Sequence, residues 1–494
     1  MTDALLGVVI AVPVLASVVP LIASFWRDKI GWYVALIALS VNAFIVASIV
    51  RGFLNEGRLS HEVGGVSVPY GIELALDGLS VPILVLVALV SLGTLVYTRN
   101  AGPRSNSFYS GYLLLTAGLI GVTVTGDVFN LYVFIEITGL TAYALIASGD
   151  DGRSAYAALK YLIAGTVGAS LYLIGIAYAF VATGTLNMAD LSARLAEVGH
   201  SDTLVLTSFA FVVAGLGVKV ALFPLHTWQP DAYSSAPYGV AAYVSALVST
   251  VSAYALGRLV LTVYTPEFLV SNPVVSSALV YFGALSIVAG SVLAVLQTDV
   301  RRLLAYSSVS QFGLVVVAFG IANPTSVFGG VVTLFGHAVV KGSLFFAAGI
   351  FAYRLGVTRL DEYEGLARKM PYTGAAFAVL ALTLVGVPPA VGFVGKWYVA
   401  LGAVRAGETS VAVVIFASTL LTLMYVARLV DRMYYGAAGT GTSETAVADG
   451  GTGGVCVTYG MVALVVLAAI AVVVLGPVAS AVQETLALGE VLGT

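Results

Sequence analysis

Long apolar segments recur along almost the whole chain, and they restrict its possible folds more than any other feature. About 20 apolar residues cross the hydrocarbon core of a bilayer, and segments of that length follow one another from residue 4 to residue 480. The 494 residues are 59% hydrophobic and 10% charged, whereas a soluble domain carries about 25% charged residues. The sequence therefore predicts an all-α polytopic membrane protein without a separate soluble domain.

The apolar segments predict 14 transmembrane helices. They lie at about 4–25, 32–50, 77–97, 109–126, 128–147, 157–181, 204–225, 238–262, 272–296, 302–322, 326–352, 372–402, 410–430 and 455–480. Among the connections, 60–74 alternates in polarity and contains Gly-Gly, which predicts a short hairpin. The connection 431–454 is rich in Gly, Thr and Ser, which predicts a flexible exposed loop.

The basic residues outside the spans predict the orientation of the chain. Loops after odd-numbered spans hold 13 Lys and Arg residues, and loops after even-numbered spans hold four. Cytoplasmic loops carry the excess of positive charge, so the odd loops are expected in the cytoplasm and both termini outside the plasma membrane. The first segment has no basic region before it and is long enough to span, so we expect a retained helix and no cleaved signal peptide.

Four of the six lysines lie inside apolar segments: Lys160, Lys219, Lys341 and Lys396. A lysine in hydrocarbon costs about 2.5 to 3.5 kcal/mol on insertion scales. Burial can deprotonate a lysine but not an arginine, and this chain keeps almost all its arginines in loops. Glu136 and His337 lie in segments of the same kind. These residues together indicate a protein that moves protons.

Two predicted spans contain proline beside a buried lysine. Lys219 and Pro224 lie in GLGVKVALFPLHTWQP (215–230), and Pro388, Pro389 and Lys396 lie in LVGVPPAVGFVGKW (384–397). Proline removes a backbone donor, and in a membrane the freed carbonyls are tolerated only inside protein or beside a water-filled cavity. Paired interrupted helices are typical of inverted-repeat transporters; two ordinary proline kinks are the alternative.

Five spans separate the two interruptions, which fits two inverted five-helix repeats, each with one broken helix. The predicted organisation is helices 1–3 over 1–108, a first repeat over 109–262, a second repeat over 263–436, and a loop with a last helix over 437–494.

Five long motifs resemble the antiporter-like family shared by Mrp-type sodium/proton antiporters and respiratory complex I. They are DVFNLYVFIEITGLTAYAL (127–145), GVKVALFPLHTWQPDAYSSAP (217–237), QTDVRRLLAYSSVSQFG (297–313), HAVVKGSLFFAAG (337–349) and GVPPAVGFVGKW (386–397). In length the chain resembles the D subunit of Mrp antiporters and the M and N subunits of complex I. The M subunit carries glutamate where this chain has Lys396, so the lysine favours the D subunit of Mrp antiporters or the N subunit of complex I.

The resemblance implies roles for the buried ionisable residues. Glu136 would pair with Lys219, and opening of the pair would act as a switch for proton loading; a static ion pair is the alternative. His337 and Lys341 are four residues apart, on one face of a helix, and histidine titrates near neutral pH, so a relay through both to Lys396 is expected. The alternative for His337 is a satisfied core histidine.

Three further residues are candidate members of the relay. Lys160 matches a family lysine. His226, with Trp228 and Asp231, would line the mouth of a half-channel or cap a short helix. Thr250 occupies the position of a lysine that the family carries in its eighth span. Three outcomes are open. A water held by the Thr250 hydroxyl bridges the gap, Arg258 two turns further on assists proton transfer, or the subunit has lost proton conduction.

The preferred prediction is a subunit of a multi-subunit sodium/proton antiporter, most like the D subunit of the Mrp type. The alternatives are a proton-pumping subunit of complex I or of a membrane-bound hydrogenase, where it would be part of a translocase, and a non-conducting structural subunit. Expected partners are the other subunits, the lipid bilayer, protons and, as a candidate coupling ion, sodium. A single cysteine, Cys456, and no nucleotide-binding glycine motif argue against a redox cofactor or a metal site. A net charge of −3 gives no reason to expect nucleic acid.

Overall fold

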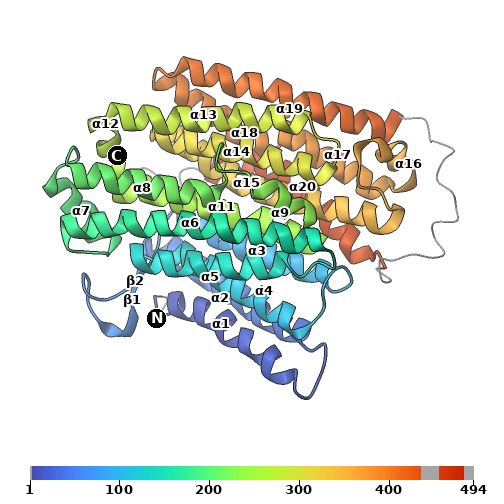
Figure 1. The fold of residues 1–494 in the computed structure, drawn as a ribbon, viewed down its shortest axis with the longest axis horizontal. Coiled ribbons are helices and arrows are strands. Elements are labelled where there is room, and N and C mark those ends of the chain that lie inside the picture. The colour runs from blue at the N-terminus through green and yellow to red at the C-terminus, as the bar shows by residue number, and fades with distance from the viewer. Residues whose placement is uncertain (1–2, 436–455, 483–494) are drawn as a thin grey trace.

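The computed structural model describes residues 3–435 and 456–482, in which long helices run side by side along the long axis of the molecule (Figure 1). The first part of the chain forms α1 (Leu5–Ala23), α2 (Gly31–Glu56), β1 (Leu59–Glu62), η1 (Val63–Gly65), β2 (Glu73–Leu76), α3 (Ser80–Thr98), α4 (Asn106–Val124), α5 (Val128–Ile146), α6 (Gly152–Thr183), α7 (Met188–Val198) and α8 (Thr203–Val220).

The second part continues the bundle. It forms α9 (Gln229–Ser235), α10 (Tyr238–Tyr243), η2 (Val244–Val248), α11 (Ser249–Arg258), η3 (Leu259–Val263), α12 (Thr265–Ser271), α13 (Pro273–Val295), α14 (Val300–Ile321), α15 (Pro324–Leu355), η4 (Leu360–Tyr363), α16 (Leu366–Lys369), α17 (Pro371–Val385), α18 (Val391–Arg405), α19 (Thr409–Tyr435) and α20 (Tyr459–Val482). The loop predicted over 431–454 lies, from residue 436 onward, outside the described residues.

The predicted number of spans is confirmed. Within the described residues, 13 helices are long and apolar enough to cross a membrane. The remaining predicted span, 372–402, is divided between α17 and α18. The protein is therefore an all-α, multi-pass membrane protein apart from one small hairpin.

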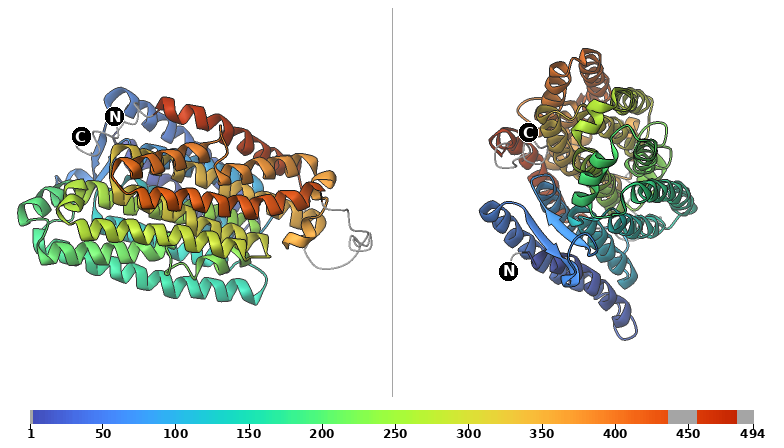
Figure 2. Two further views of the ribbon diagram at one scale, coloured as in Figure 1. Left: turned by 90° about the horizontal axis from the view of Figure 1, so that it is seen from above. Right: turned by 90° about the vertical axis from the view of Figure 1, so that its left-hand side faces the viewer.

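That hairpin is also confirmed. β1 and β2 pair antiparallel, with Leu59 opposite Leu76 and Glu62 opposite Glu73. It lies at the end of the bundle where α1 begins, together with α7 and α12, while α16 lies at the opposite end (Figure 1). α20 also ends at this end of the bundle (Figure 2), as an even number of crossings requires. Which end faces the cytoplasm stays a prediction.

Polar residues set where the helices begin. Asp127, Asp151 and Asp299 each precede a helix and accept a hydrogen bond from a backbone N–H of its first turn, which satisfies one donor that the helix leaves free. These short polar stops separate apolar runs that would otherwise merge.

The centre of the molecule is formed by α14, α15 and the helical stretch Tyr238–Val263, whose residues are almost all buried. This stretch contains two π-helical turns, η2 and η3, and π turns frequently occur at functional positions. The outer helices α1 and α20 expose most of their apolar side chains, which suits contact with lipid. The boundaries of the two repeats stay a prediction.

Candidate functional site

The first interruption lies between α8 and α9. α8 ends at Ala221, whose φ of 66° is left-handed, and the chain passes through Pro224 before α9 begins. The interruption frees carbonyl oxygens at the end of α8. The indole N–H of Trp228 donates to one of them, that of Val218, at 2.8 Å. Trp228 therefore supports the broken end that carries Lys219.

The second interruption, between α17 and α18, also begins with a left-handed residue. A different side chain donates to the freed carbonyl oxygens. α17 ends at Gly386, whose φ is 94°. The ammonium of Lys396, on α18, donates to the carbonyl oxygens of Leu384 at 3.1 Å and Val385 at 2.8 Å. A cation at a helix C-terminus is favoured by the helix dipole, so the broken helix itself stabilises Lys396.

Glu136 and Lys219 form the ion pair that the sequence predicted. Nζ of Lys219 lies 3.2 Å from Oε1 of Glu136. Only 3% of the Lys219 side chain is exposed, against 24% of Glu136. The hydroxyl of Tyr143 lies at 3.2 Å from the same Nζ, so the ammonium has two oxygen partners, one charged and one neutral.

A small cavity adjoins this pair. It has a volume of about 10 Å³ and is lined by nine residues: Val122, Ile135, Thr138, Gly139, Tyr161, Lys219, Val248, Val251 and Ser252. Among the described residues, the hydroxyls of Thr138 and Tyr161 have no hydrogen-bond partner. A space of about 10 to 15 Å³ with polar partners is the least that holds one water. The cavity is therefore just large enough for one water, and it lies between Lys219 and the helical stretch Tyr238–Val263.

His337 and Lys341 both lie on α15 and are buried. Lys341 donates to the carbonyl oxygen of Leu304 at 2.7 Å and to the hydroxyl of Ser307. Neither ring nitrogen of His337 has a partner among the described residues, although buried polar groups are nearly always hydrogen-bonded. No protein group of the described chain therefore satisfies His337, and which of the two roles it has stays a prediction.

A second cavity, of about 20 Å³, connects His337 with the second interruption. Its polar lining is Gln311, Thr333, His337 and Thr383. Leu384 also lines it, and the carbonyl oxygen of Leu384 accepts from Lys396. A water in this cavity would link the imidazole to the surroundings of Lys396.

Lys160 lies in a different place from the other three lysines. Its side chain is 33% exposed, and its Nζ lies 2.6 Å from Oδ2 of Asp231. The other oxygen of Asp231 lies 2.7 Å from Nη1 of Arg302. One carboxylate thus ties α6 to α14, across the two predicted repeats. Sequence reasoning missed this pairing, because Asp231 lies 71 residues from each of its two cations.

His226 lies in the first interruption with its ring stacked on Phe223 at 5.3 Å. It is buried, and its Nδ1 has no partner among the described residues. Trp228 is the N-cap residue of α9, but no side-chain hydrogen bond caps the helix; the carbonyl oxygen of His226 accepts from the N–H of Gln229 at 3.0 Å instead. The half-channel mouth stays a prediction.

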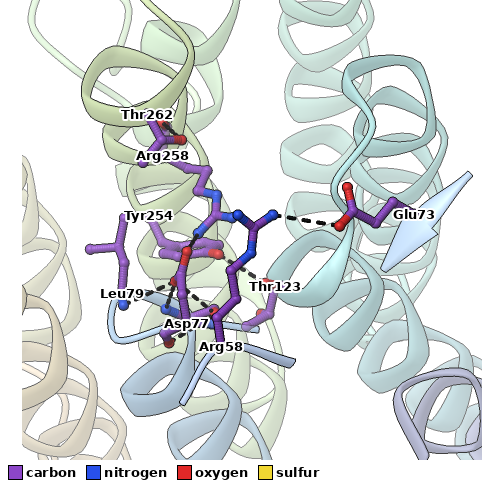
Figure 3. Close-up of polar contacts among 9 residues, drawn as sticks. Arg58, Glu73, Asp77, Leu79, Thr123, Tyr254, Arg258 and Thr262 are labelled. Atoms are coloured by element: carbon purple, nitrogen blue, oxygen red, sulfur yellow. Dashed lines mark hydrogen bonds and ion pairs between the residues drawn. The ribbon is translucent and has the colours of Figure 1, made fainter. Parts of the chain in front are cut away.

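Thr250 is fully buried on α11, and its hydroxyl has no partner among the described residues. Arg258 does not compensate for the missing lysine, because it forms a buried ion pair with Asp77, before α3. Figure 3 shows the two side chains facing each other beside Tyr254, with Glu73 turned toward Arg58. A buried arginine needs a carboxylate, but only the structure identifies Asp77, 181 residues away, as that partner.

The predicted residues therefore form two groups, with the eighth span between them. Glu136 and Lys219 form the first, and His337, Lys341 and Lys396 the second. Thr250 lies on this span, which packs against α8, α14 and α15, so the position at which the resemblance implied a lysine lies between the groups.

Comparisons with known proteins identify the family of the chain. A family model described as "NADH:quinone oxidoreductase/Mrp antiporter, TM" matches residues 125–422. The N subunit of the NADH-quinone oxidoreductase of Desulforudis audaxviator (strain MP104C) is 43% identical over 407 residues, 81% of this chain and 80% of that protein. The D subunit of the Na(+)/H(+) antiporter of Bacillus subtilis (strain 168) is 31% identical over 402 residues, with the same coverage of 81% and 80%.

Two solved structures are similar over almost the whole chain. One protein of the Mrp complex from Dietzia sp. DQ12-45-1b superposes with a TM-score of 0.88 at 25% identity, covering 99% of this chain and 97% of that one. One protein of the membrane-bound sulfane sulfur reductase, an archaeal respiratory membrane complex, gives a TM-score of 0.87 at 29% identity with the same coverage. This chain therefore belongs to the family of membrane subunits that NADH:quinone oxidoreductases and Mrp antiporters share.

Proposed function

We propose that the chain conducts protons as one membrane subunit of a multi-subunit complex. The observation that carries the proposal is the second group: Lys341 and Lys396 are buried with no carboxylate partner among the described residues. A lysine held only by carbonyl and hydroxyl oxygens can lose its proton without leaving an opposite charge uncompensated. Such a site suits proton transfer better than it suits structural support.

The first group would load and release the proton by a switch. While Glu136 stays close, its carboxylate stabilises the ammonium of Lys219. When the pair opens, Lys219 becomes an isolated buried cation and gives up its proton. The cavity toward Ser252 is the nearest space for a water that receives it.

The second group would carry the proton from α15 to α18. Lys341 and His337 are one turn apart, and the cavity beside His337 is also lined by Leu384, whose carbonyl oxygen accepts from Lys396. Histidine accepts and donates protons near neutral pH. Lys396 would be the last site, at the second interruption.

For the assembly, we propose a complex I-like, redox-driven complex in preference to the Mrp-type antiporter that the sequence favoured. The support is the greater identity to the N subunit of a quinone oxidoreductase, 43% against 31% for the D subunit of an antiporter over the same share of the chain. Lys396 fits either choice. Other subunits would supply the redox chemistry.

A sodium/proton antiporter remains the second candidate, because the Dietzia Mrp protein superposes as well as the respiratory one does. Purification of the native complex in mild detergent, followed by mass spectrometry, separates the two. Iron–sulfur subunits support the redox-driven complex, and a set of small membrane subunits supports the antiporter.

The proposed conduction is tested by proton uptake in inverted vesicles that contain the whole complex. Lys219→Ala and Glu136→Ala are each expected to reduce uptake at least tenfold while the amount of assembled complex is unchanged. Lys29→Ala and Glu197→Ala, in exposed positions, are the matched controls and should keep wild-type uptake. Wild-type uptake in Lys219→Ala would show that the buried charges are structural.

Thr250→Val tests how the two groups are connected. The substitution keeps the shape of the side chain and removes a buried hydroxyl that has no protein partner among the described residues. If that hydroxyl holds a bridging water, uptake should fall about tenfold with no loss of assembly. Thr94→Val removes another unpartnered buried hydroxyl of the described chain, on α3, and should leave uptake unchanged. Equal uptake in both variants would place the connection elsewhere.

A further inference from the structure

Tyr143 contacts Nζ of Lys219, the atom that gains and loses the proton in the first half of the proposed path. It lies on α5, two turns after Glu136, and its hydroxyl is 3.2 Å from Nζ of Lys219. The same Nζ lies 5.8 Å from the centre of the Tyr143 ring. The ring is buried, and it meets Tyr161 edge to face at 4.5 Å.

The space around this hydroxyl is made by a missing side chain. A Cβ atom at Gly165, on α6, would lie 1.9 Å from the Tyr143 hydroxyl and 3.4 Å from Nζ of Lys219. No other residue fits there without moving the hydroxyl away from the lysine. Three helices, α5, α6 and α8, thus meet at this contact.

The hydroxyl can do what Glu136 cannot. An ionised carboxylate only accepts hydrogen bonds, whereas a phenol both accepts and donates. Tyr143 accepts from the ammonium of Lys219, and after deprotonation it can donate to the lone pair of the neutral amine. Glu136 has no proton to offer to that amine.

We propose that Tyr143 is a positioning residue that holds Lys219 in place in both of its protonation states. The inference rests on the proposed function, because it assumes that Lys219 exchanges a proton. Glu136 then sets when the proton leaves, and Tyr143 sets where the amine lies when it does. Without the hydroxyl, the neutral amine would be free to turn away from the cavity that adjoins it.

Tyr143→Phe in the intact complex tests the assignment. We expect proton uptake to fall about tenfold with unchanged assembly. The alkaline limb of the pH–rate profile should move by about half a unit to lower pH, because the bond accepted from the ammonium is the stronger of the two bonds and its loss favours the neutral amine. A purely structural role would lower the rate without moving that limb. Tyr109→Phe removes a buried hydroxyl on α4 that donates to the carbonyl oxygen of Thr98, outside both groups of buried charges, and should match the wild-type rate and pH profile.

A double-mutant cycle gives a second readout that does not depend on the size of the Tyr143→Phe effect. Gly165→Ala should reduce uptake about tenfold in the wild type by displacing the hydroxyl, and should add little in the Tyr143→Phe background. The inference is overturned if the effects of Gly165→Ala and Tyr143→Phe multiply as independent effects do. It is also overturned if Tyr143→Phe keeps the wild-type rate and pH profile. Lys219→Ala distinguishes the two proposals: if it retains uptake, the proposed function fails, and if it abolishes uptake while Tyr143→Phe is silent, only this inference fails.

Discussion

At the scale of single residues, the buried lysines differ in what holds them. Lys219 is held by a carboxylate, whereas Lys341 and Lys396 are held by carbonyl and hydroxyl oxygens. The two kinds of site respond differently to substitution, because a carboxylate can be neutralised by a proton and a backbone carbonyl cannot.

Lys396→Glu is predicted to disrupt the second interruption. It would place a carboxylate beside the carbonyl oxygens of Leu384 and Val385, where the wild type has a donor. We expect little assembled complex and a lower Tm. Lys396→Met has a similar length and no charge, so it should assemble in greater amount but lose proton uptake, with a cost of about 1 to 3 kcal/mol for each carbonyl left without a donor. Equal assembly of the Glu and Met variants would contradict this account of the site.

Residue types alone predicted part of this site. Lysine in an apolar run is rare and costly, so Lys219, Lys341 and Lys396 were identifiable from the sequence, and the family resemblance implied that Glu136 pairs with Lys219. The acceptors of Lys341 and Lys396 are mainly backbone carbonyls, which every residue has, and no sequence pattern distinguishes them. The carboxylate partners of Lys160 and Arg258 are 71 and 181 residues away in the sequence, so these pairings appeared only in the structure.

At the scale of elements, each interruption begins with a residue of left-handed backbone conformation, which follows the first of the two helices that the interruption separates. It is Ala221 after α8 and Gly386 after α17. Hydropathy predicted the spans well because burial in lipid sets their length. Hydropathy alone could not divide 372–402 into α17 and α18, because both halves are apolar. The division depends on backbone angles around Pro388 and Pro389, and only these prolines indicated it in the sequence.

Gly386→Ala is predicted to damage transport more than stability. At φ 94° a side chain is strained, and a Cβ would lie 3.2 Å from Cδ of Lys396. The strain costs about 1 to 2 kcal/mol, and the displaced lysine should reduce proton uptake at least fivefold. Ala221→Gly is the matched substitution in the other direction; it relieves strain and should keep uptake and raise Tm slightly. Wild-type uptake in Gly386→Ala would show that the position of Lys396 is not critical.

At the scale of the whole molecule, three helices precede the first predicted repeat, and a buried ion pair is one of the contacts that join them to it. Asp77, just before α3, pairs with Arg258 at the end of α11, and its carboxylate also accepts from the N–H groups of Leu79 and Ser80. The contact therefore joins 1–108 to the span that carries Thr250 and separates the two groups of buried charges. Its side chains are 15% and 8% exposed, so removal of either partner leaves the other as an unpaired charge away from water.

Arg258→Met and Asp77→Leu should each destabilise the protein by about 3 to 5 kcal/mol, because each leaves one buried charge unpaired. The double variant should recover most of that loss, since apolar replacement of a whole buried pair is often neutral. Thermal unfolding of the purified complex measures all three. Arg359→Ala is the control, because its pair with Asp361 is more than half exposed on both sides and is expected to contribute less than about 1 kcal/mol. Losses that simply add in the double variant would mean that the residues act separately. A recovered Tm together with reduced proton uptake would instead mean that the pair also sets the position of the eighth span, where Thr250 lies between the two halves of the proposed path.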